Sequence, residues 1–129
     1  MNNLDKESII GISALLVHAA NIDEIYSNHE KELIKNFINS YLKDGNTNEI
    51  LKNAEEIEKN SNQLLNYTNI IKQKSMDIKK DIVEHLWKVI ISDNSVDQYE
   101  ANLMRRICGL IYFPDKESGE IKLRLLNSK

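Results

Sequence analysis

Apolar residues recur at intervals of three and four positions along most of the chain, which is the period of an amphipathic helix. In the first such segment the apolar stripe is broad, so we expect that helix to be buried along most of its length. The pattern predicts no strand. The expected helices cover about residues 5–21, 28–43, 50–57, 64–74, 76–90 and 98–111, with a last one that opens at 113–115.

Polar residues between these stripes supply signals for the ends of helices. Ser75 is placed as the N-cap of the longest helix, because a serine oxygen there accepts a hydrogen bond from an amide of the first turn. Gly45 favours a left-handed stop after the second helix. Proline is favoured at the first position of a helix, so Pro114 helps to open the last one. The fold class is therefore all-α, a bundle of about seven helices.

An acidic phrase occurs twice in register, seventy positions apart, at residues 23–30 and 93–100. Each copy has Asp first, an apolar residue fourth, a helix-capping residue fifth and Glu eighth. The match continues downstream, where 33, 34, 37 and 38 fall opposite 103, 104, 107 and 108 in the apolar stripe of a helix. We interpret the chain as two related helix, acidic turn, helix units joined by an intervening segment.

The length of 129 residues suits one domain with one core, so residues 1–129 are expected to form a single domain. Four glycines and one proline are too few for a turn-dense β-sandwich. The formal net charge of -3 argues against dedicated nucleic-acid binding, which usually needs a strong basic excess.

The N-terminal sequence has neither the basic start nor the long apolar stretch of a secretory signal, and no apolar segment has the length of a membrane span. The lone Cys108 excludes an internal disulfide and lies on an apolar stripe, so we place it in the core. A cytoplasmic protein is expected.

Helix capping alone explains some of the residues in each acidic phrase. Ser27 with Glu30, and Asp97 with Glu100, each fit a capping box, in which the cap residue and the Glu three positions later bond each other's backbone amide. Carboxylates in a first helical turn also gain from the helix dipole. This explanation leaves out the Asp that opens each phrase, because it lies at the end of the preceding helix, where the dipole disfavours negative charge.

The functional interpretation is that the two turns bring Asp23, Glu30, Asp93 and Glu100 together around a divalent cation, with Asp97 and Ser27 as further candidates. Converging carboxylates repel one another unless a cation neutralises them. Hard oxygen ligands favour Ca²⁺, Mg²⁺ or Mn²⁺ over Zn²⁺.

Two common metal motifs are excluded. An EF-hand counted from the first Asp of either phrase needs Glu at its twelfth position, where Ile34 and Met104 stand. The histidines His18, His29 and His85 are isolated and lack the spacing of a zinc site. We expect His29 on the surface.

No enzyme chemistry is expected and no catalytic residue is assigned, since the chain has no Gly-rich phosphate loop and no serine in a nucleophile-elbow context. Trp87 and Tyr112 are expected in the core. The apolar strip at 121, 123 and 126 fits either core or a dimer contact. A solvated acidic face is expected for Asp77, Asp81 and Glu84, with Glu84 paired to Lys88.

The two phrases at this separation resemble the TerB-like family, small all-helical domains named after tellurite resistance protein TerB, to which the N-terminal domain of the co-chaperone DjlA is related. The segments 84–89 and 103–107 resemble the stretches around the family's second turn, and the likeness spans about 4–126. Where the family has Gly after each first Asp, this chain has Glu24 and Asn94; Asn adopts a left-handed backbone more readily than Glu.

The resemblance implies a non-catalytic domain linked to tellurite and general stress resistance, with acidic turns that bind a cation. Tellurite is an oxyanion, which clustered carboxylates would repel, so a role in resistance would run through a bound cation or a protein partner. The alternative is a helical protein-interaction or co-chaperone-type accessory domain without metal, in which the acidic turns are helix caps.

Overall fold

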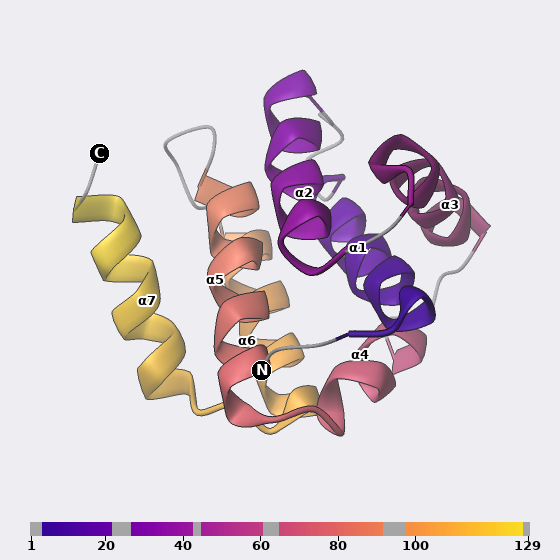
Figure 1. Ribbon diagram of the computed structural model, residues 1–129. Coiled ribbons are helices and arrows are strands. Elements are labelled where there is room, and N and C mark those ends of the chain that lie inside the picture. Colours follow the sequence, from indigo (N-terminus) through magenta and orange to yellow (C-terminus); the bar gives the residue numbers. More distant parts are fainter. Residues whose placement is uncertain (1–3, 22–26, 43–44, 61–64, 92–97, 128–129) are drawn as a thin grey trace.

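Helix α1 (Lys6–Ala20) is the central element of the fold, and it packs against α2 (Asn28–Tyr41), α3 (Thr47–Asn60), α4 (Leu65–Lys72) and α5 (Met76–Ile91). The computed structural model describes residues 4–21, 27–42, 45–60, 65–91 and 98–127. Figure 1 shows the arrangement of these helices. The broad apolar stripe of α1 is buried along most of its length, as the sequence predicts, because four helices surround it.

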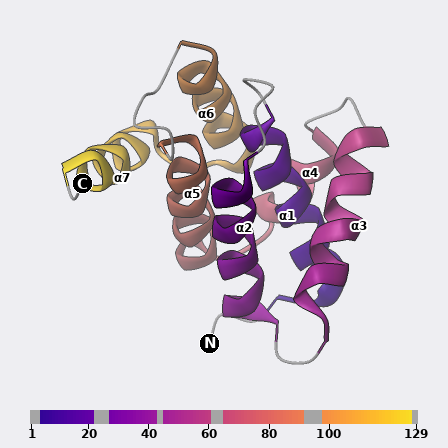
Figure 2. The ribbon, with the colours of Figure 1, turned by 90° about the horizontal axis from the view of Figure 1, so that it is seen from above.

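The second unit is completed by α6 (Gln98–Ile111) and α7 (Asp115–Asn127), which both pack on α5. In Figures 1 and 2, α3 and α7 lie at opposite edges of the molecule, with α1, α2 and α5 between them. The all-α class and the seven predicted helices are confirmed within the described residues, which contain no strand.

Side-chain caps fix the starts of several helices. The Asp5 carboxylate accepts a 2.7 Å hydrogen bond from the Ser8 amide at the start of α1. The Ser75 hydroxyl accepts one from the Ile78 amide at the start of α5, which confirms the predicted cap. Such bonds satisfy amides that have no partner within the helix. The starts of α1 and α5 are therefore fixed by hydrogen bonds from backbone amides to polar side chains.

The core is one apolar cluster to which all seven helices contribute. The indole of Trp87 on α5 is buried in it and donates a 3.0 Å hydrogen bond to the Ser118 hydroxyl on α7, so its polar group has a partner. Cys108 is buried, as predicted. On α7, Ile121 joins the core whereas Leu123 is exposed, so the apolar strip of this helix is divided between core and surface.

The prediction that Tyr112 is a core aromatic is wrong, because its side chain is 64% exposed. Tyr112 ends α6 in the left-handed region, with φ at 61°. The next amide, of Phe113, donates a 2.9 Å hydrogen bond to the Cys108 carbonyl, as in a Schellman motif. This turn buries Phe113 and leaves Tyr112 outside.

Candidate metal site

The structure describes some of the residues of the predicted cation site. Asp23, Asp93 and Asp97 lie outside the described residues. The two glutamates, Glu30 and Glu100, are both described, and each is the third residue of its helix, α2 and α6. They therefore occupy equivalent positions in the two pseudo-repeated units.

Both glutamates are buried, with Glu30 7% and Glu100 4% exposed. Carboxylates are rarely buried to this extent unless a hydrogen bond or an ion offsets the loss of water. A position in the first helical turn adds a favourable interaction with the helix dipole. The sequence alone identified both residues as candidates, but it gave no signal that they are enclosed.

The capping box predicted for the first turn is confirmed. The Ser27 hydroxyl accepts a 3.2 Å hydrogen bond from the Glu30 amide, and Glu30 Oε1 accepts a 2.8 Å bond from the Ser27 amide. The Ser27 hydroxyl also donates to the same Oε1 at 3.1 Å. One carboxylate oxygen of Glu30 is therefore committed to holding the start of α2.

The first residues of α2 and of α6 lie at the same end of the bundle. Figure 1 shows α1 and α5 ending, and α2 and α6 beginning, at the upper end of the molecule. Residues that share a role in each repeat are thus brought to one end. The carboxylate oxygens of Glu30 and Glu100 are of the type that Ca²⁺, Mg²⁺ and Mn²⁺ accept. By donor type alone, these two side chains suit a hard cation.

Among all the described residues, Glu30 and Glu100 included, no group of three or more His, Cys, Asp and Glu side chains is placed to hold a metal ion. His29 is exposed, as predicted. His18 pairs with Glu58 at 3.3 Å, and His85 with Asp81 at 3.5 Å. His18 and His85 are thus each placed beside a carboxylate.

The expectation of a solvated acidic face on α5 holds only for part of it. The pairing of Glu84 with Lys88 is confirmed at 4.0 Å, and Glu84 also pairs with Arg124 of α7. Asp81, however, accepts a hydrogen bond from the buried Tyr41 on α2. This carboxylate is a contact between helices, because α2 packs on that side of α5.

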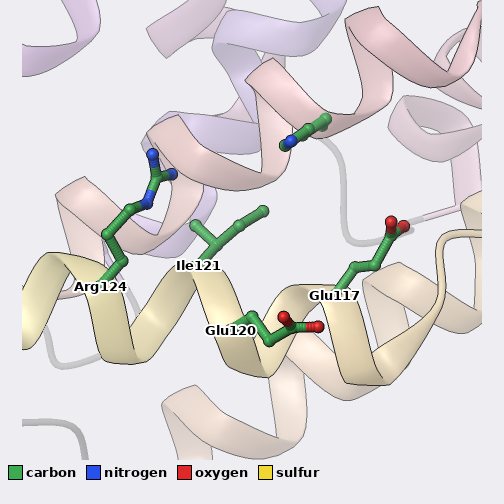
Figure 3. A pocket seen from close by; sticks show the side chains of 5 residues that line it. Glu117, Glu120, Ile121 and Arg124 are labelled. Carbon is green, nitrogen blue, oxygen red and sulfur yellow. The ribbon is translucent and has the colours of Figure 1, made fainter.

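A surface pocket of about 350 Å³ lies between α5 and α7 (Figure 3). Ile121 forms its apolar part, and its charged lining comes from Lys80, Glu117, Glu120 and Arg124. Arg124 is already paired with Glu84. Neither Glu30 nor Glu100 lines this pocket, so it is separate from the described part of the candidate metal site.

The described residues form an all-helical fold, and the sequence places one acidic phrase between α1 and α2 and another between α5 and α6. The family model described as Tellurite resistance protein TerB matches residues 10–123. The chain therefore belongs to the TerB family. Neither the curated proteins nor the solved structures gave a match. Among the described helices, none has the length and apolar character to cross a membrane.

Proposed function

We propose that this TerB-family domain is a non-catalytic, cytoplasmic module of tellurite and stress resistance that binds a divalent cation at its two acidic turns. Asp23, Glu30, Asp93 and Glu100 supply the ligands, with Asp97 and Ser27 as further donors. Ca²⁺, Mg²⁺ or Mn²⁺ is the expected ion. Its partner is expected to be another protein rather than nucleic acid.

The observation that supports this proposal most is the burial of Glu30 and Glu100 at equivalent positions of the two units. A capping glutamate needs only one oxygen for its box and is stable when exposed to water. Both enclosed carboxylates already contact other protein groups, which holds them in place, and a divalent cation would neutralise the negative charge that burial disfavours.

A second function is favoured by a different observation. The closed capping box of Ser27 and Glu30 shows that at least one of these glutamates has a structural role. In this alternative the chain is a helical protein-interaction or co-chaperone-type accessory domain, and the acidic turns only fix the directions of α2 and α6. The two functions differ in what they require of Asp23 and Asp93, which no cap explains.

Electron paramagnetic resonance of Mn²⁺ separates the two. The double variant Asp23→Asn with Asp93→Asn keeps the size of both side chains but removes their charges. We expect it to leave Mn²⁺ free at concentrations where the wild type binds it. The matched control is Asp77→Asn, which neutralises an exposed carboxylate on α5. Equal Mn²⁺ binding by all three proteins would favour the interaction domain.

A further inference from the structure

The exposed ring of Tyr112 lies beside two lysines from another part of the chain. The ammonium nitrogen of Lys72, at the end of α4, is 5.1 Å from the ring centroid, and that of Lys79, on α5, is 6.0 Å away. Both distances are those of cation–π contacts. Three segments of the chain therefore converge on one aromatic side chain at the surface.

Lys79 is unusual because its side chain is almost wholly buried, at 7% exposed. Among the described residues, no carboxylate lies within ion-pair distance of Lys79 or Lys72. A buried ammonium is normally paired with an anion. Here two like charges lie near the face of one ring, and neither forms an ion pair with a carboxylate in the described part of the chain.

Tyr112 itself is held in a costly conformation. Its left-handed φ of 61° is normally adopted by Gly or Asn at the end of a helix. Burial of the ring does not offset this cost, because most of the side chain faces solvent. The helix end that buries Phe113 is the cause of this conformation, and it leaves the ring of Tyr112 at the surface. A tyrosine fixed in place also loses little freedom when a partner covers it.

We propose that Tyr112, Lys72 and Lys79 form a docking surface for an acidic segment of a partner protein. A carboxylate of that segment pairs with the ammonium group of the exposed Lys72, the buried Lys79 adds positive charge beside the ring, and the carbon chain of the segment lies against the exposed ring. The few cations and the net charge of -3 suit a short acidic peptide better than a nucleic acid, which requires many phosphate contacts.

This surface is distinct from the acidic turns. Glu100 lies in the first turn of α6 and Tyr112 follows its last residue, so about 18 Å of helix separates them, at 1.5 Å per residue. The docking surface can therefore be tested in the presence of a chelator, which removes any contribution from a bound cation.

The probe is a fluorescein-labelled peptide of glutamates, measured by fluorescence anisotropy at low ionic strength with chelator. We expect binding that weakens as salt is added. Lys72→Gln and Tyr112→Gly should each weaken it about five-fold or more, as expected for loss of about 1 kcal/mol. Tyr112→Gly also relieves the left-handed strain, so it should melt no lower than the wild type. The matched control is Lys52→Gln, which removes one exposed charge from α3 and should leave the affinity unchanged.

Several outcomes would overturn the docking surface. One is no binding of the glutamate peptide by the wild type. A second is an equal loss of affinity in Lys52→Gln, which would show that the peptide is attracted by overall charge. A third is an unchanged affinity in Tyr112→Gly. Tighter binding of an oligothymidine or of phosphatidylserine vesicles, with the same dependence on Lys72 and Tyr112, would assign the surface to a nucleic acid or a membrane instead.

Discussion

The hydroxyl of Tyr41 donates a hydrogen bond to the carboxylate of Asp81 across a distance of 2.5 Å, which ties α2 to α5. The same carboxylate lies 3.5 Å from Nδ1 of His85, whose ring packs edge-on against Phe37. One helix of the first unit is thereby joined to one helix of the second through a polar contact at the margin of the core.

Replacing Tyr41 by Phe should lower the free energy of unfolding by about 1.5 kcal/mol, since it removes a hydrogen bond to a charged group while keeping the ring. Urea unfolding followed by circular dichroism measures the change. The matched control is Tyr112→Phe, whose hydroxyl is at the surface; it should differ little from the wild type. Equal effects in the two variants would show that the Tyr41 bond adds nothing.

Alkaline pH should act on the same bond. Burial raises the pKa of Tyr41 above its ordinary value, and the hydrogen bond to Asp81 and the charge of Asp81 raise it further. A raised pKa in the folded state means that the stabilisation is complete below the unfolded-state pKa, near 10, and is lost as the pH rises through the folded-state value. The melting temperature of the wild type should therefore fall faster above about pH 10 than that of Tyr41→Phe. Parallel curves would contradict this linkage.

The Trp87–Ser118 bond gives a test of the junction between α5 and α7. Ser118→Ala leaves the buried indole N–H without its acceptor, so unfolding should become easier by about 1–3 kcal/mol. Ser40→Ala is the comparison, because Ser40 is exposed and its hydroxyl donates to the Asn36 carbonyl one turn earlier in its own helix. We expect chemical denaturation to separate the two variants clearly; similar midpoints would assign Trp87 a purely apolar role.

The helices were predictable because their signals are local. Apolar spacing identified each of the seven, and Ser75 and Ser27 marked starts that the structure confirms. The contacts between helices were not predictable in the same way. Tyr41 bonds Asp81, and Glu84 pairs with Arg124, each across forty positions of sequence. Such contacts depend on how two helices are rotated against each other.

The sequence contains a weaker signal for the exposure of Tyr112 than for the helices. An aromatic residue after an apolar stripe is usually buried, but here the left-handed end of α6 turns the chain so that Phe113 enters the core instead. Only the proline at 114 pointed to a helix end at this place. Of the candidate site, the sequence identified Glu30 and Glu100 by their place in the repeat, whereas their burial depends on the packing of both units.

Two variants of the first turn separate capping from cation binding. Glu30→Gln retains the capping box, since Gln serves in it as well as Glu, but removes the charge. We expect it to melt close to the wild type without metal and to lose stabilisation by a divalent cation. Ser27→Ala should cost about 1 kcal/mol of stability, as other lost caps do, and should keep most of the stabilisation by the cation, because every charged ligand remains. Differential scanning fluorimetry with and without Mn²⁺ compares them; identical cation responses would exclude Glu30 as a ligand.

The most direct test of the account is a thermal melt of chelator-treated protein titrated separately with Ca²⁺, Mg²⁺, Mn²⁺ and Zn²⁺. An ion that binds only the native state, at about 100 times its dissociation constant, stabilises it by about 2.7 kcal/mol, which is a shift of several degrees for a domain of this size. We predict a saturable rise in the melting temperature with Ca²⁺, Mg²⁺ or Mn²⁺, and no larger rise with Zn²⁺. A melting temperature that no ion changes would contradict the cation site and leave the acidic turns as helix caps.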